Sequence, residues 1–191
     1  MSEQLHDYEA VSVYHLDDED REKLLRHHAE CSFNWSTRDG WPMGVIMSFL
    51  WHDGRIWLTA GAHRHRISAV RRDPRVSIVI TSTGTKLGPG KSITVKGRCL
   101  IHEDRETKDW FYPAFSRHLH RGNEEAAAGF EKFLDSPMRV VLEVIPEKWI
   151  TYDGAKMALD SVGKLPEDRK RAPLESDTLR FERERKKRGL S

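Results

Sequence analysis

The sequence predicts a mainly β protein with helices at some of the joins (α+β class), in which about six mostly antiparallel strands close into a small barrel. Runs rich in aromatic and β-branched residues, typical of strands, are separated twice by Asp-Gly, at 39–40 and 53–54. Helical segments between the strands are too sparse for a doubly wound parallel sheet. No GxGxxG follows the first strand, which disfavours a classical dinucleotide-binding fold. Long, twisted strands joined by one short helical crossover favour closure into a barrel.

The first half of the chain contains most of the regular pattern. Acidic residues crowd the start of 17–30, which predicts a helix that Asp17 or Asp18 can cap. A meander of three strands is expected next, because the glycines of the two Asp-Gly pairs tolerate the positive φ of tight turns. The expected strands are 31–37, 41–51, 55–61 and 75–83, with a short helix at 68–72 before the last of them.

The second half alternates strand and helix more loosely. Apolar and polar side chains alternate from Ser92 to Asp104, and Gly97 marks a bulge or a close approach in that strand. A helix should run from Asp104 to His120, broken or restarted at Pro113. A Gly/Pro loop at 84–91, a helix at 123–134 and a long last strand at 138–153, bent at Pro146, complete this half.

The composition changes near Gly154. Residues 154–191 contain few apolar side chains and a dense mixture of charges. Such a segment cannot bury a core of its own. We therefore expect one domain over 1–153 and a charged C-terminal tail over 154–191.

Composition also limits the classes of function. The 32 Lys and Arg nearly balance 30 Asp and Glu, so a net charge of +2 gives no global reason to bind nucleic acid. The N-terminus has no apolar segment after a basic start, and no apolar run has the length of a membrane span, so a cytoplasmic protein is expected. Cys31 and Cys99 have no metal or redox spacing, which favours buried thiols over a disulfide.

A basic turn is the most informative local feature. Arg64, His65 and Arg66 fall where a strand passes into a helix N-terminus, whose N–H groups favour an anion. Arginine offers forked donors that match phosphate oxygens, and Gly61 and Ala62 let the backbone approach a ligand. The pattern indicates a phosphate clamp, although solvated surface charges would give the same run.

The run DGRIWLTAGAHRHRISAVRRDPRVSIVI, preceded by MSFLW and followed by ITVKGRCLIHED, resembles the pyridoxamine 5′-phosphate oxidase-like, FMN-binding split-barrel family. The resemblance covers about residues 20–152, and its most specific parts are RRDPRVS and VKGRC. It implies a six-stranded antiparallel split β-barrel that forms a homodimer, with FMN in a groove at the subunit interface.

The resemblance also implies where the cofactor binds. The basic phosphate turn falls on Arg64, His65 and Arg66, and an aromatic residue near the cofactor falls on Trp149. The strand along the flavin ring and the neighbouring cofactor-facing positions fall on Val45, Ile46, Met47, Ser48, Thr59, Ala60, Lys91 and Ser92.

Two departures from the family pattern limit the function. The family's turn usually carries Ser-Arg-Lys, where this chain has Arg-His-Arg, and a neutral histidine would give one phosphate contact less charge. The Arg-x-His-Asp-Arg motif of true pyridoxamine phosphate oxidases is replaced by RFERERKKRG, so oxidation of pyridoxine phosphates is not expected.

The expected function is a flavin (FMN) oxidoreductase that moves a hydride or electron pair to or from a small organic substrate. The alternatives are a reductase that uses a deazaflavin coenzyme, with Lys86, Lys91 and Lys96 near its acidic tail, and a non-enzymatic module that binds flavin or, less expectedly, haem. No catalytic residue can be assigned, because the cofactor carries the chemistry. No metal site is expected, because the histidine pairs at 63/65 and 118/120 lack a complete ligand set.

Overall fold

The computed structural model describes residues 11–190. Its strands are β1 (Glu30–Ser36), β2 (Pro42–Ser48), β3 (Leu50–His52), β4 (Arg55–Gly61), β5 (Arg75–Thr81), β6 (Lys91–His102) and β7 (Arg139–Asp153). Its helices are α1 (Asp18–His27), α2 (His65–Arg72), α3 (Arg105–Leu119), α4 (Glu124–Leu134), α5 (Gly154–Ser161) and α6 (Glu175–Lys187), with 3-10 turns at Val11–Val13 and Glu167–Arg169. The described part of the chain thus has seven strands rather than the expected six.

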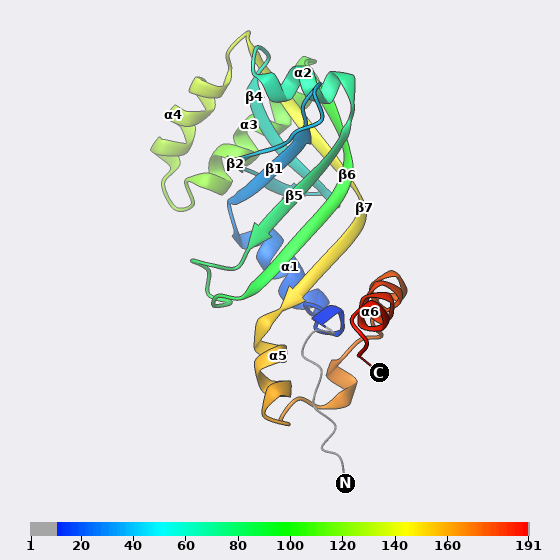
Figure 1. Ribbon diagram of the computed structural model, residues 1–191. Coiled ribbons are helices and arrows are strands. Elements are labelled where there is room, and N and C mark those ends of the chain that lie inside the picture. The colour runs from blue at the N-terminus through cyan, green and yellow to red at the C-terminus, as the bar shows by residue number, and fades with distance from the viewer. Residues whose placement is uncertain (1–10, 191) are drawn as a thin grey trace.

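All the strand pairs are antiparallel, in the order β2-β1-β5-β6-β7-β4-β3. Both expected Asp-Gly hairpins form, as β1–β2 and β3–β4, but the middle run 41–51 is not one strand, because it divides at Phe49 into β2 and β3. Phe49 is fully buried, and its backbone N–H donates to the carbonyl of Ala29 at 2.9 Å. β2 and β3 are the opposite edges of the sheet, yet only Phe49 separates them, so the sheet must roll until its edges approach (Figure 1).

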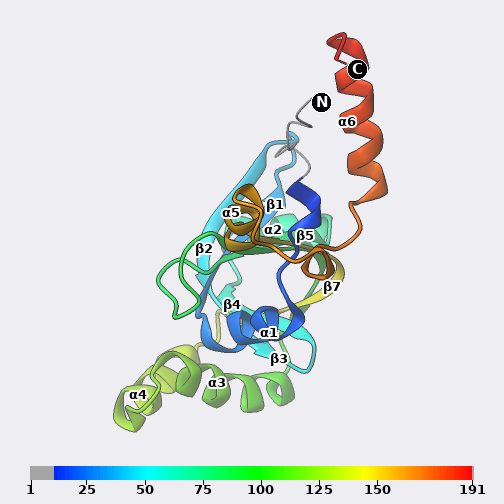
Figure 2. The ribbon, with the colours of Figure 1, turned by 90° about the horizontal axis from the view of Figure 1, so that it is seen from below.

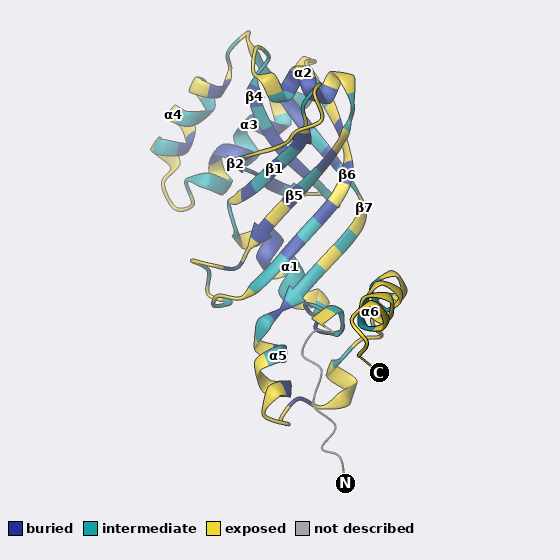
Figure 3. Cartoon of the chain, in the orientation of Figure 1, coloured by how far each residue is buried: buried dark blue, intermediate teal, exposed yellow. Residues whose placement is uncertain are grey.

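The main hydrophobic core fills the inside of this rolled sheet. Leu24 and Leu25 of α1 and Ile67 and Val70 of α2 contribute to it, so both helices cover the interior (Figures 1 and 3). A second cluster lies on the outer face of β3, β4 and β7, where α3 and α4 pack, as the view from below shows (Figure 2). Trp57 and Phe111 belong to that outer cluster, so the β4 strand separates two apolar layers.

Gly97 is both a bulge position and a point of close approach, as expected. The β6–β7 register shifts between Lys96 and Gly97, which pair with Lys148 and Pro146. A Cβ at Gly97 would lie only 2.4 Å from the carbonyl oxygen of Ile145. The bulge accommodates Pro146 within a single strand, since a proline cannot donate to the ladder.

The expected helices form, with differences at their ends. Asp104 caps α3 by accepting the backbone N–H of Thr107 at 2.7 Å, and Pro113 lies inside α3 without ending it. The short helix begins at His65 rather than Ser68, so the basic turn runs directly into its first turn. Asp17 occupies the N-cap position of α1, but its side chain makes no capping bond.

The carboxylate of Asp17 instead joins the two ends of the described chain. It accepts bonds from Lys156 Nζ at 2.6 Å and Arg169 Nη2 at 2.7 Å, and the bond from Lys156 is the main reason that its pKa is lowered. The Tyr14 hydroxyl donates to Asp160 at 2.6 Å. Residues 156–169 therefore pack against the N-terminal segment, whereas α6 buries none of its residues (Figure 3). The division at residue 154 stays a prediction.

Both cysteines are buried and free, in agreement with the sequence. Burial is the main cause that raises the pKa of each thiol, to about 12. Within residues 11–190, no helix combines the length and the apolar character that a membrane crossing requires.

Candidate functional site

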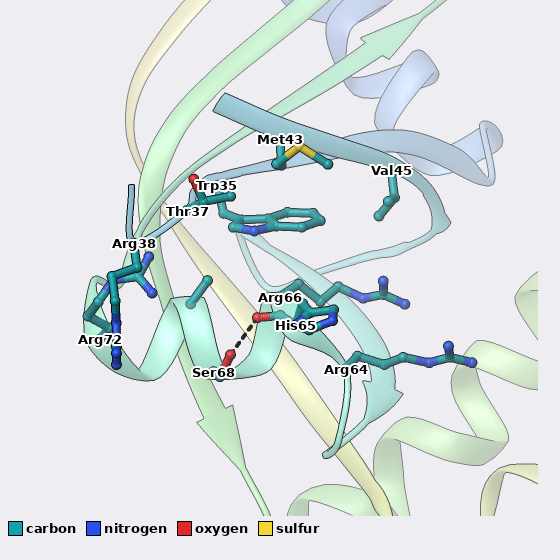
Figure 4. Close-up of a pocket in the computed structure, with 11 residues that line it drawn as sticks. Trp35, Thr37, Arg38, Met43, Val45, Arg64, His65, Arg66, Ser68 and Arg72 are labelled. Carbon is teal, nitrogen blue, oxygen red and sulfur yellow. Dashed lines mark hydrogen bonds between the residues drawn. The ribbon is translucent and has the colours of Figure 1, made fainter. Parts of the chain in front are cut away.

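A groove of about 590 Å³ lies between α2 and the strands β1 and β2 (Figure 4). Its lining combines aromatic and aliphatic side chains with basic ones, and none of its residues is acidic. The lining residues are Trp35, Thr37, Arg38, Met43, Val45, Arg64, His65, Arg66, Ser68, Ala69 and Arg72.

The apolar wall of the groove is the inner face of β1 and β2. Trp35 pairs with Met43, and the buried Phe33 pairs with Val45, so Met43 and Val45 share the inward-facing side of β2. β2 is an edge strand, and its inner face is only partly covered, since Met43 remains 46% exposed. The groove therefore lies along the inner face of the edge strand β2, on the side where α2 approaches it.

The basic wall is the N-terminal end of α2. Arg64 is the N-cap residue with extended backbone, and His65 and Arg66 form the first turn. The first N–H groups of an α-helix have no intrahelical acceptor, so they favour an anion. Arg64 and Arg66 extend in the same direction beside the groove (Figure 4).

Arg66 is the least satisfied of these basic side chains. Its Nε is buried and has no hydrogen-bond partner among the described residues. Burial, and then the positive charge of Arg64, lower the pKa of its guanidinium. Two neighbouring cations with a buried donor left over make an arrangement that an added anion would stabilise.

Four of the predicted cofactor residues meet in this groove, namely Val45, Arg64, His65 and Arg66. His65 is exposed, and its carbonyl accepts a bond from the Ser68 hydroxyl at 2.8 Å, which is drawn in Figure 4. The basic turn that the sequence singled out therefore lines a cavity, while phosphate binding there stays a prediction.

The other predicted residues of β2 and β4 do not line the groove. Ile46 points to the opposite side of β2 and is 68% exposed, while Met47 and Ala60 are buried in the core. The Thr59 hydroxyl donates to the carbonyl of Val140 at 2.8 Å. Ser48 is half-buried at the end of β2. A cofactor contact at these positions stays a prediction.

Lys91 and Ser92 begin β6, and Trp149 lies in the second half of β7. The start of β6 and the end of β7 are at the other end of the sheet from α2 (Figure 1). Lys91 Nζ donates to Asp153 at 2.8 Å and to Asp20 at 2.9 Å. Burial would lower the pKa of Lys91, but the two carboxylates outweigh it and the pKa is raised. Its charge is thus already balanced within the chain.

Trp149 is also held by contacts within the chain. It meets Trp51 edge to face with ring centroids 5.8 Å apart, and the Arg21 guanidinium lies 5.5 Å from its ring centroid. The proposed lysines of an acidic-tail site, Lys86, Lys91 and Lys96, are likewise absent from the groove lining.

The sequence analysis missed Trp35, Arg38, Met43 and Arg72 as groove residues. The pairing of Trp35 with Met43 across the Asp-Gly turn could have placed both on the inner face of one hairpin. Nothing local could have shown that the C-terminal end of α2 approaches that hairpin.

The rolled antiparallel sheet with helices at its joins defines a small, mainly β barrel, with an apolar groove beside the N-terminal end of α2. Residues 17–153 match the family model for pyridoxamine 5′-phosphate oxidase, which is more than half of the 191 residues. The chain therefore belongs to the pyridoxamine 5′-phosphate oxidase family. A comparison with curated protein sequences finds no match.

Solved structures share the fold at low sequence identity. A conserved hypothetical protein from Mycobacterium tuberculosis is 19% identical with a TM-score of 0.65, and the alignment covers 78% of this chain and 91% of that one. An FAD-binding protein from Mesorhizobium loti is 20% identical with a TM-score of 0.53, covering 71% and 94%. An F420 reductase is 20% identical with a TM-score of 0.52, covering 67% and 94%. At these identities the likeness establishes the fold alone.

Proposed function

We propose that the protein is an oxidoreductase that binds FMN in the groove, with the phosphoryl group at Arg64, His65 and Arg66. The observation that carries the proposal is the buried Arg66 Nε, which has no partner within the described residues and is adjacent to a second cation. A phosphoryl group would satisfy that donor and reduce the repulsion between the two guanidinium groups.

The remainder of the groove suits a flat, largely apolar ring. Trp35, Met43 and Val45 provide an apolar wall, and a volume of about 590 Å³ falls in the usual range for small-ligand sites. Bound flavin would supply the transfer of a hydride or electron pair. The chain itself would anchor the phosphoryl group, orient the ring and exclude water from one face.

The first test compares two flavins that differ only in the phosphoryl group. Titration of the cofactor-free protein, followed by flavin fluorescence, should give FMN at least about tenfold higher affinity than riboflavin, since a charge-assisted hydrogen bond contributes about 1.5–3 kcal/mol. The visible spectrum of the purified protein would identify a co-purifying flavin, deazaflavin or haem. Equal affinities for FMN and riboflavin would contradict a phosphate clamp at α2.

A deazaflavin coenzyme is the second candidate, because the groove offers positive charge beyond the phosphate turn. Arg38 and Arg72 line it in addition to the three basic residues at 64–66. A neighbour described as an F420 reductase has the same fold. Titration with the deazaflavin coenzyme F420 under the same conditions would decide between the two cofactors by their relative affinities.

We further propose a homodimer, on the evidence of an apolar row on the outer face of the sheet. Ile46, Ser32, Val79, Thr94 and Ile150 pair in register across five strands. The three apolar members are 68%, 37% and 36% exposed, respectively, in the single chain. Three exposed apolar side chains in one row, separated by the half-buried Ser32 and Thr94, favour an interface with another protein surface. Because Ile46 is on the reverse side of β2 from Val45, such an interface would adjoin the groove.

Replacing Val79 with lysine should convert the dimer into a monomer. The charge would be buried without a partner at the interface, whereas the exposed side chain leaves the core of the single chain intact. Sedimentation velocity would measure the change. A parent protein that sediments as a monomer at all concentrations would contradict the proposed dimer.

A further inference from the structure

The groove is basic at two separate ends. Arg64 and Arg66 extend toward one end, Arg38 and Arg72 gather at the other, and Trp35 lies between them (Figure 4). Arg66 and Arg72 are six residues apart on α2, which corresponds to about 9 Å along the helix axis. Because the two pairs also extend in opposite directions, a phosphoryl group held between Arg64 and Arg66 would lie away from Arg38 and Arg72.

The second pair is held in place by the fold. Arg72 donates through Nη2 to the backbone carbonyl of Ser36, which fixes the end of α2 against β1. Arg38 is in the turn after β1, where the Thr37 hydroxyl oxygen accepts the backbone N–H of Trp41 at 2.9 Å. The same hydroxyl donates to Asp39 at 2.5 Å, so the turn is fixed by its own bonds.

Acidic groups close in sequence to this pair are already bonded. Asp73, which follows Arg72, accepts two bonds from the Arg75 guanidinium, from Nη2 at 2.6 Å and from Nε at 2.9 Å. Asp39, which follows Arg38, accepts the Thr37 hydroxyl. In the described chain, the Arg38 side chain forms neither a hydrogen bond nor an ion pair. Its charge is therefore available to a ligand in the groove.

Arg72 has a structural role at the end of α2, whereas Arg38 is an exposed turn residue whose side chain has no partner in the described chain. A cation at the C-terminal end of α2 suits the helix dipole, and Arg72 also satisfies the Ser36 carbonyl. Neither role requires a second arginine to converge on the same end of an apolar groove that lacks carboxylates. An anion bound between Arg38 and Arg72 could accept hydrogen bonds from both guanidinium groups.

We propose that Arg38 and Arg72 form a second anion site, which binds a carboxylate or phosphoryl group at the end of the groove away from Arg64 and Arg66. The inference rests on the proposed function, because it concerns the same groove. It predicts that the groove holds an apolar ring with one anionic group at each end. Both groups can belong to one ligand, or each can belong to a different ligand. The second anion comes either from an acidic tail on the coenzyme or from an anionic substrate that meets the flavin.

The test uses the full-length protein with Arg38 and Arg72 both replaced by glutamine. Three probes are titrated by calorimetry: FMN, the deazaflavin coenzyme F420 with its acidic tail, and inorganic phosphate added to FMN-saturated protein. The single variant Arg38→Gln keeps the Arg72 bond to Ser36. It therefore tests the site even if the double variant fails to fold. Arg71→Gln is the matched control, because Arg71 is on the same helix but pairs with Glu103 at 2.6 Å outside the groove.

The double variant should bind FMN within about twofold of the affinity of the parent. Its affinity for the probe that supplies the second anion should be at least about tenfold lower than that of the parent. A loss for F420 assigns the site to the coenzyme tail, and a loss for phosphate on FMN-saturated protein assigns it to an anionic substrate. Unchanged affinity for both F420 and phosphate overturns the second site while the flavin function stands.

A large loss of FMN affinity also overturns the second site, because the phosphoryl group of FMN would then bind at Arg38 and Arg72. If the parent binds no flavin or deazaflavin, the proposed function fails, and with it the inference.

Discussion

Replacing Arg66 with alanine is expected to weaken FMN binding by about 10- to 100-fold. The guanidinium would provide charge-assisted hydrogen bonds to the phosphoryl group, and each such bond contributes about 1.5–3 kcal/mol. Riboflavin lacks that group, so its affinity should change little. Fluorescence titration of both flavins against parent and variant would measure the difference.

The matched control is Arg71→Ala, which removes an exposed arginine of the same helix that does not line the groove. Its FMN affinity should equal that of the parent. The folding of Arg66→Ala should be retained, because removing the side chain also removes a buried donor without a partner and the repulsion from Arg64. An FMN affinity of Arg66→Ala equal to that of the parent would exclude Arg66 from phosphoryl binding.

Replacing Gly97 with alanine is expected to destabilise the barrel by about 1–3 kcal/mol or more. The new Cβ would lie 2.4 Å from the Ile145 carbonyl oxygen and 3.2 Å from Val144 Cγ1. The first contact is with backbone in the adjacent strand, so relief requires β6 and β7 to separate at the bulge. Urea unfolding, followed by tryptophan fluorescence, would give the change in the free energy of unfolding.

Gly129→Ala is the same chemical change, but it is expected to stabilise the protein rather than destabilise it. Gly129 is exposed within α4, and a Cβ there would meet no atom within 4 Å. Alanine should therefore stabilise the protein by about 0.5–1 kcal/mol, as it does in helix interiors. If both variants unfolded at the same urea concentration as the parent, the close packing at Gly97 would be disproved.

The local elements of this fold are readable from the sequence because their causes are local. The Asp-Gly turns, the acids at the start of α1 and the Asp104 cap depend on neighbours within a few residues. The division of 41–51 at Phe49 does not. Its strand pattern is continuous, and the break exists because β2 pairs with β1 while β3 pairs with β4 on the opposite edge. The number of strands was therefore misjudged where non-local pairing overrides a continuous pattern.

The residues of the candidate site likewise fall into those that local sequence can predict and those that depend on tertiary packing. The basic turn at Arg64 and Arg66 follows from a strand-to-helix junction, which can be recognised within ten residues. The opposite wall depends on how β1 and β2 pack against α2, so Arg38 and Trp35 could not be placed from the sequence. Lys91 was assigned to the cofactor, but Asp20 and Asp153, 71 and 62 positions away, are its partners in the structure. Only the tertiary structure brings those carboxylates to it.

The bonds of Tyr14 and Asp17 to residues of α5 also have a consequence for folding during synthesis. Tyr14 and Asp17 find their partners Asp160 and Lys156 only 146 and 139 positions later. During synthesis, these side-chain bonds therefore cannot form until residues beyond β7, the last strand of the barrel, have left the ribosome. A nascent chain that stalls at the end of β7 would carry every strand of the sheet and the bonds that join Asp153 and Thr151 to Tyr14 and Leu16, but it would lack the partners of the Tyr14 and Asp17 side chains.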